Sequence, residues 1–168
     1  MTRLYHLWLA LLTLPALLFE SRRRTLFREM QAFCRNLPAA LKGPLPQALQ
    51  KLTPDVLRIA YSVSDTHYAI RTTVRNLADV AALLDHRSPL GLCLRRSLVR
   101  YHFLRREGLP VVLQFGAKFV AGKLDREVTG HAWLTLDGQP YHEADENWRG
   151  FVVMFSYPNG SGDSVTSL

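Results

Sequence analysis

Three residues have types and an order that suit nucleophilic catalysis: Cys93, His131 and Glu143. A thiol attacks a carbonyl carbon efficiently only as the thiolate, which a neighbouring imidazole generates by taking up the thiol proton. A carboxylate beside the imidazole holds its tautomer and stabilises the imidazolium. Asp145, two residues beyond Glu143, is the competing acid. These residue types indicate amide hydrolysis through a thioester acyl-enzyme.

Cys93 is expected in the first turn of a helix. Residues 88–91 form a predicted turn, and apolar residues then recur at helical spacing until Gly108-Leu109-Pro110 ends the pattern. The unpaired amides of a first turn and the positive end of the helix macrodipole favour a thiolate, and the same amides can bind an oxyanion. Gly91 leaves space for a substrate backbone to approach.

The pattern becomes extended after this helix. Strands are predicted over residues 111–115, 127–136, 139–143 and 151–155. Asp137-Gly138 is a strong signal for a two-residue hairpin turn. Such a turn pairs Leu136 with Gln139, and continuing this register brings Glu143 next to His131. The hairpin therefore predicts a carboxylate beside the imidazole.

The same residues have simpler explanations that were weighed. Cys34 lies in an apolar run and is expected to be a small buried hydrophobe. A metal site would have to use ligands from Cys93, His131, His142 and Glu143. The close ligand pairs that mark zinc sites, Cys-x-x-Cys or His-x-x-x-His, do not occur in the sequence, so no metal is expected.

Three stretches carry a resemblance to a known family. They are Cys93-Leu94-Arg95-Arg96-Ser97-Leu98, Leu104-Arg105-Arg106-Glu107-Gly108, and His131-Ala132-Trp133-Leu134 with Asp137-Gly138. Together they resemble the transglutaminase-like cysteine peptidases of lasso-peptide biosynthesis, over roughly residues 88–143. The resemblance implies that Cys93 is the nucleophile, His131 the general base and Glu143 the orienting acid, with Asp145 as the alternative.

The resemblance also implies a fold and a function. The fold is α+β, with a transglutaminase/papain-like core, an N-terminal helical half and a short antiparallel sheet packed on the nucleophile helix. The expected regions are a helical N-terminal region (1–87), a transglutaminase-like catalytic core (88–158) and a flexible tail (159–168). The expected function is removal of the leader peptide from a ribosomally synthesised lasso-type precursor. Its partners would be that precursor peptide, a leader-binding presenting protein and the ATP-dependent lasso cyclase, and the chemistry requires no cofactor.

Two other functions remain open at this stage. The same three residues suit a transglutaminase-like acyltransferase, in which an amine replaces water. Alternatively, the chain is a non-catalytic basic scaffold that binds peptides and has a spent site.

Composition narrows the setting. A hydrophobic fraction of 48% predicts a folded domain, and two cysteines do not make a disulfide framework, so a cytoplasmic protein is expected. The net charge of +7 favours an acidic partner, but no RNA-recognition, zinc-finger or helix-turn-helix signature occurs, so nucleic acid is not expected. Residues 4–19 predict an amphipathic or buried helix, with peripheral membrane attachment as the alternative.

The first 87 residues show helical spacing in three pieces. These are residues 26–33 up to a break at Pro38, a segment that begins at residues 53–55, and residues 74–84. Gly43-Pro44-Leu45-Pro46 is predicted as a further break, and the helical half has no chemical motif of its own.

Overall fold

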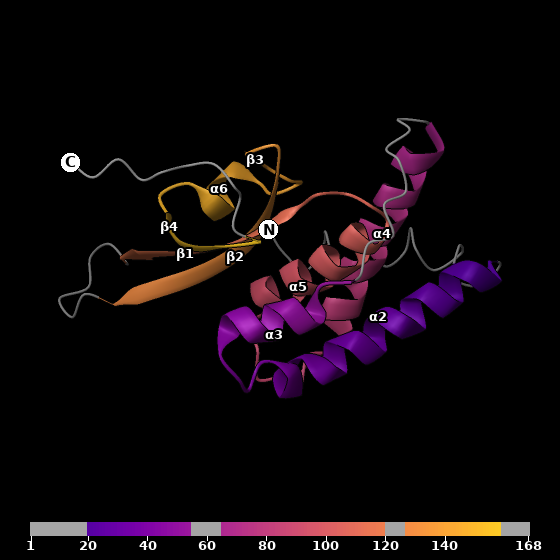
Figure 1. The fold of residues 1–168 in the computed structure, drawn as a ribbon, viewed down its shortest axis with the longest axis horizontal. Helices are drawn as coiled ribbons and strands as arrows, with labels where there is room; N and C mark the ends of the chain where they lie inside the picture. Colours follow the sequence, from indigo (N-terminus) through magenta and orange to yellow (C-terminus); the bar gives the residue numbers. More distant parts are fainter. Residues whose placement is uncertain (1–19, 55–64, 120–126, 159–168) are drawn as a thin grey trace. The chain divides into compact units, whose positions relative to one another are not determined.

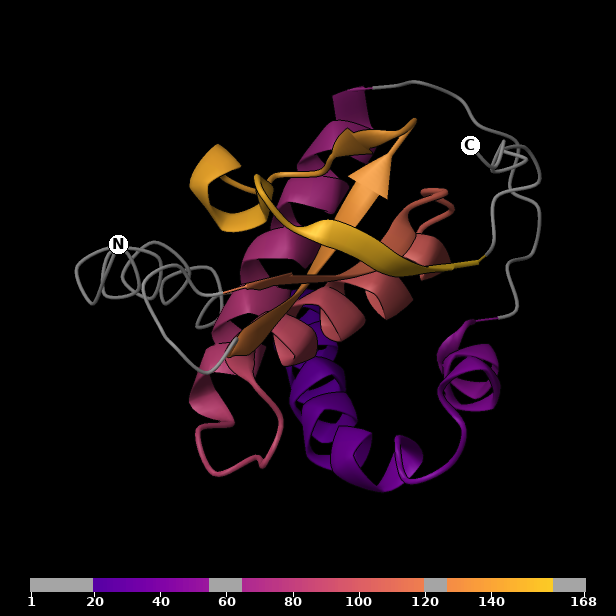
Figure 2. The same cartoon turned by 90° about the vertical axis from the view of Figure 1, so that its left-hand side faces the viewer.

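The structure is a computed structural model of the 168-residue chain that describes residues 20–54, 65–119 and 127–158 (Figures 1 and 2). The described residues form helices and a small antiparallel sheet, so the protein is α+β, as predicted. The chain divides into two compact units, Met1–Leu109 and Pro110–Leu168. They are called the helical unit and the sheet unit below.

The helical unit contains α2 (Ser21–Ala40), α3 (Leu45–Leu52), α4 (Asp65–Leu84) and α5 (Leu92–Arg106). Helices α2, α4 and α5 pack on one another. Each helix buries apolar residues three or four positions apart, which are Met30, Cys34 and Leu37 from α2, Val74, Leu77 and Ala81 from α4, and Leu98, Tyr101 and Leu104 from α5. Burying one such large side chain contributes about 1.5–3 kcal/mol to folding, so this core holds the helices together.

The helix boundaries differ from the predicted ones in two places. Pro38 does not end α2, because in the last turn a proline removes only one backbone hydrogen bond, and the amide of Leu41 still donates to the carbonyl of Leu37 at 3.0 Å. The predicted break at residues 43–46 contains the start of α3, whose second residue is Pro46. Proline is tolerated there because the first amides of a helix have no partner within it.

Other expectations fall in different parts of the chain. The predicted helix over residues 74–84 is confirmed as the second half of α4. The helix predicted from residue 53 onwards, the N-terminal segment 4–19 and the tail 159–168 lie outside the described residues. Within the described ranges, no helix is long and apolar enough to span a bilayer.

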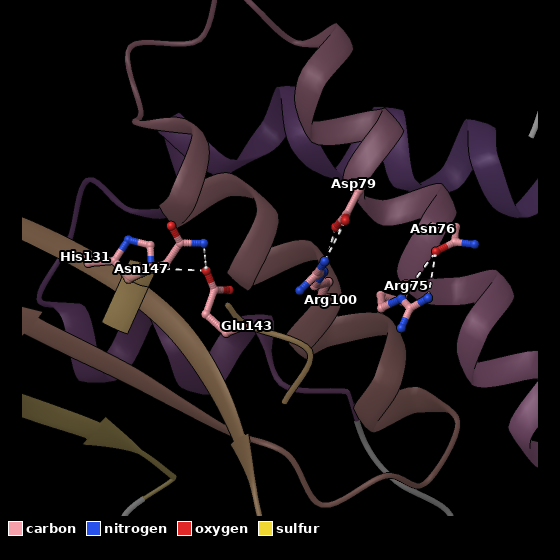
Figure 3. A network of polar contacts seen from close by, with 7 residues as sticks. All are labelled: Arg75, Asn76, Asp79, Arg100, His131, Glu143 and Asn147. Atoms are coloured by element: carbon pink, nitrogen blue, oxygen red, sulfur yellow. Dashed lines mark hydrogen bonds and ion pairs between the residues drawn. The ribbon is translucent and has the colours of Figure 1, made fainter. Parts of the chain in front are cut away.

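Two arginines of α5 join it to α4. The guanidinium of Arg100 donates to both carboxylate oxygens of Asp79, at 2.6 and 2.5 Å, and both side chains are buried (Figure 3). Arg95 donates to the carbonyl oxygens of Ala82, at 2.8 Å, and of Asp85, at the end of α4. These carbonyls are among those that a helix C-terminus leaves without partners, so Arg95 ties the end of α4 to the start of α5, two residues from Cys93.

The other half of α5 holds the end of α3. The hydroxyl groups of Tyr101 and Thr53 are 3.0 Å apart, and Nδ1 of His102 donates to the carbonyl oxygen of Leu52 at 2.6 Å. The ring of His102 lies 4.5 Å from that of Phe33. This burial lowers the pKa of His102 below its ordinary 6.5; the bond to Leu52 opposes the effect.

The sheet unit contains β1 (Val112–Phe119), β2 (Val128–Leu136), β3 (Gln139–Pro140), α6 (Asp145–Trp148) and β4 (Val152–Tyr157). The strand order is β3-β2-β1-β4, and neighbouring strands are antiparallel. The predicted pairing of Leu136 with Gln139 is confirmed. Both residues of the turn between them have positive φ, Asp137 at 50° and Gly138 at 76°, as the predicted hairpin turn requires.

The returning strand is shorter than predicted. It was expected to run to residue 143, but β3 ends at Pro140, which has no amide hydrogen to donate. Tyr141 still donates to the carbonyl oxygen of Leu134 at 2.8 Å, and His142 then turns the chain with a φ of 50°. Glu143 is therefore reached through a bend.

Replacing Asp79 with Ala should lower the free energy of unfolding by about 3–5 kcal/mol, because it leaves the buried charge of Arg100 uncompensated. Urea denaturation measures this. The double variant Asp79→Leu with Arg100→Met is the control and should recover much of the loss; a loss below about 1 kcal/mol in the single variant would contradict the assignment.

The stability of the helical unit should also depend on pH through His102. Because its pKa is lower in the folded protein, the unfolded chain binds the proton more readily, and stability falls as pH decreases below 6.5. His102→Gln can still donate to Leu52 but does not titrate, so its free energy of unfolding should fall less between about pH 7 and 5. Equal losses in the two proteins, measured by urea denaturation, would show that His102 does not contribute.

Candidate active site

Cys93 is the second residue of α5 and is half-buried. Helix α5 begins after Gly91, which has no side chain with which to cap the first amides. A Cβ atom built on Gly91 would lie 3.9 Å from Sγ of Cys93, so the glycine leaves the sulfur's surroundings open. The thiol therefore lies at the positive end of a 15-residue helix, as the sequence predicts.

Cys34 has the opposite environment. It is fully buried in α2, and burial, together with the negative charge of Asp85, raises the pKa of its thiol to about 12. A thiol in this setting is not a nucleophile at neutral pH, so Cys34 packs as a small hydrophobe, as predicted.

In the sheet unit, the structure brings His131 and Glu143 together. Oε1 of Glu143 lies 3.5 Å from Nε2 of His131, and the two side chains are only 2% and 13% exposed (Figure 3). Asp145, the competing acid, is 59% exposed and pairs with Arg149 at 2.6 Å. The geometry therefore favours Glu143 as the acid that orients the imidazole.

A tight loop delivers Glu143 to this position. It begins at His142, with a φ of 50°, contains the single turn of α6, and leaves through Gly150, with a φ of 81°. The amide of Arg149 donates to the carbonyl of Asp145 at 2.9 Å, which closes α6, and α6 lies against β2. The loop thus holds Glu143 beside the strand that carries His131.

The sequence analysis missed Asn147. Its side-chain amide donates to Oε1 of Glu143 at 2.9 Å, so it contacts the same oxygen that faces His131. The four-residue spacing between Glu143 and Asn147 is a helical signal, but it was hidden in a stretch that looked like an acidic loop.

Two aromatic rings enclose the imidazole. Trp133 lies parallel to it at 5.8 Å between ring centroids, and Phe151 lies at 5.4 Å. Gly116 is the residue opposite His131 on β1, and a Cβ atom there would lie 2.7 Å from the Trp133 ring. The missing side chain of Gly116 is therefore what allows Trp133 to lie across the sheet and support His131. Lys118 places its ammonium 4.3 Å from the Phe151 centroid.

The predicted site residues thus lie in two units. His131 and Glu143 are in contact in the sheet unit, whereas Cys93 belongs to the helical unit, and its approach to His131 stays a prediction. The division of the chain into functional regions at residues 87 and 88 also stays a prediction. In the parts of the chain that the structure describes, no group of three or more His, Cys, Asp or Glu side chains could hold a metal ion.

Comparison with known families places this site in context. A family model described as the transglutaminase-like superfamily matches residues 11–156. The chain belongs to the transglutaminase-like superfamily. That superfamily includes cysteine peptidases and acyltransferases, and its members are commonly cysteine-dependent enzymes. Neither the curated proteins nor the solved structures gave a match. Because the matched region spans both units, helices α2 to α4 are part of this transglutaminase-like domain.

Replacing Gly116 with Ala should displace Trp133 and destabilise this transglutaminase-like protein by about 1–3 kcal/mol, because a methyl group does not fit there. Tryptophan fluorescence and urea denaturation measure both effects. Gly130→Ala is the matched control, since its added Cβ would meet only a backbone oxygen at 3.9 Å. If the two variants behave alike, the fit of Trp133 over Gly116 does not matter.

Proposed function

We propose that the protein is a cysteine peptidase that removes the leader peptide from a ribosomally synthesised lasso-type precursor. The observation that carries the proposal is the buried His131–Glu143 pair, at 3.5 Å, in a chain of the transglutaminase-like superfamily. The position of Cys93 in the first turn of α5 supports it. The motifs shared with the lasso leader peptidases provide the choice of substrate.

In the proposed reaction, His131 takes the proton of the Cys93 thiol. Because Nε2 of His131 faces Glu143, we assign this role to Nδ1. The thiolate attacks the carbonyl carbon of the last leader residue, and its electron pair moves to oxygen. Amides of the first turn of α5 would stabilise that oxyanion. The carbon–nitrogen bond then breaks, and the imidazolium protonates the leaving amine of the core peptide.

Water completes the proposed cycle. His131 removes a proton from a water molecule, which attacks the thioester and releases the leader with a new carboxylate. Throughout, the carboxylate of Glu143 stabilises the positive charge that forms on His131. No metal or redox cofactor takes part in these steps.

The charge distribution supports a peptide substrate with acidic residues. Met1–Leu109 has 17 Lys and Arg against 7 Asp and Glu, whereas Pro110–Leu168 has 4 against 7. An acidic leader would be attracted to the helical unit, and this attraction weakens with salt. In this proposal a leader-binding protein presents the precursor, an ATP-dependent cyclase uses the product, and the reducing cytoplasm preserves the thiol.

An acyltransferase is the second candidate, because the superfamily contains such enzymes. It would pass the same thioester to a primary amine. Mass spectrometry of a glutamine-containing peptide incubated with an amine separates the two functions, since only a transferase forms the amine adduct.

The proposal predicts that Cys93→Ala abolishes release of the leader, whereas Cys34→Ala cleaves at the wild-type rate. Glu143→Gln should lower kcat by about 10²–10⁴-fold, because the imidazolium loses its counter-charge. Asp145→Asn, on the exposed neighbour, should stay within about twofold. The assay is mass spectrometry of the neighbouring precursor peptide, incubated with the purified protein in the presence and absence of the presenting partner.

Two outcomes would overturn this assignment. Cleavage retained by folded Cys93→Ala would show that another residue is the nucleophile. A large loss in Asp145→Asn with none in Glu143→Gln would exchange the roles of the two acids. Failure of every protein to cleave, with Cys93 no more reactive than Cys34, would favour the non-catalytic scaffold.

A further inference from the structure

We infer that Asn147 is a positioning residue that fixes the carboxylate of Glu143 against His131. The inference rests on the proposed function, since it assigns a role within that site. It adds a fourth member to the predicted group of nucleophile, base and acid.

The contact geometry points to this role. Nδ2 of Asn147 lies 2.9 Å from Oε1 of Glu143, and the same oxygen lies 3.5 Å from Nε2 of His131 (Figure 3). A carboxylate oxygen can only accept from an amide, so the nitrogen of the Asn147 amide is the atom that faces it. The shorter of these two contacts therefore belongs to Asn147 and sets the position of Oε1.

The burial of Glu143 gives the contact its importance. A carboxylate that is 2% exposed has lost most of its water, and it needs hydrogen-bond donors to remain charged and in one orientation. The side chain of a glutamate has three rotatable bonds, so one contact at 3.5 Å to a neutral imidazole does not fix it. A second donor from a residue four positions away reduces this freedom.

The backbone around Asn147 supports the same role. Its amide donates to the carbonyl of Ala144 at 2.9 Å, and the exposed pair of Asp145 and Arg149 spans the same turn at 2.6 Å. The side chain of Asn147 is thus presented by a closed helical turn on the loop that also carries Glu143. Positions set by such local bonds are held more accurately than those on an open loop.

The mechanistic consequence concerns charge and not proton transfer to Asn147. When His131 becomes positively charged, its contact with Glu143 should shorten, as catalytic hydrogen bonds do when charge develops. Donation from Asn147 favours the ionised carboxylate and keeps Oε1 directed at Nε2 during this change. Losing it would reduce the fraction of Cys93 present as thiolate.

The test measures alkylation of Cys93 by iodoacetamide in the full-length protein between about pH 5 and 9, with mass spectrometry to separate Cys93 from Cys34. No substrate is needed. Asn147→Ala and Asn147→Leu should both lower the rate at neutral pH about tenfold and move the acidic limb of the pH profile upward. The leucine variant keeps the size of the side chain but cannot donate. Circular dichroism confirms that each variant is folded.

Two controls separate a positioning role from a structural one. Arg149→Ala removes the exposed ion pair of the same turn without touching Glu143, and it should leave the alkylation profile unchanged. In a Glu143→Ala background, Asn147→Ala should change the rate by less than about twofold, because the residue acts through the carboxylate. A full additional loss in that background would overturn the inference.

The outcomes for the inference and for the proposed function are distinguishable. If His131→Ala leaves the alkylation rate of Cys93 unchanged, the proposed function fails. If His131→Ala slows alkylation but the Asn147 variants match wild type, the function stands and the inference fails.

Discussion

A carboxylate removed from water is held by the donors around it, and the sheet unit is organised around this requirement at Glu143. The oxygen that faces His131 also accepts from Asn147, and the side chain is almost fully buried. The hairpin turn sets the strand register, the bend at His142 directs Glu143 inward, and Gly116 makes room for the ring that supports the imidazole. Each feature places one side of the imidazole environment.

The helical unit meets a different requirement, which is to fix the start of α5. Buried apolar residues hold α5 on α2 and α4, and the charges of Arg95 and Arg100 are met by groups at two levels of α4. A nucleophile at a helix start depends on the amides of that first turn, so its reactivity depends on the helix remaining in place. The superfamily match across both units agrees with a domain in which the helices belong to the core.

Much of this arrangement could be predicted from the sequence because local signals are strong. The Asp137-Gly138 turn fixed the pairing of Leu136 with Gln139, and the turn before α5 placed Cys93 in the first helical turn. Signals that depend on position within an element were misread: Pro38 lies where a helix tolerates proline, and Pro46 lies at the start of α3. Asn147 could not be predicted, because its role depends on a bend and a single helical turn that no periodicity reveals.

The central claim is that His131, held by Glu143, keeps Cys93 ionised, and a pH titration of the ultraviolet absorbance of the thiolate tests it most directly. Wild-type protein should show a thiolate that Cys93→Ser lacks and that persists to lower pH than in His131→Ala or Glu143→Gln. If Cys93 ionises at the same pH in all proteins that retain it, the imidazole and the carboxylate do not act on the sulfur, and the account is contradicted.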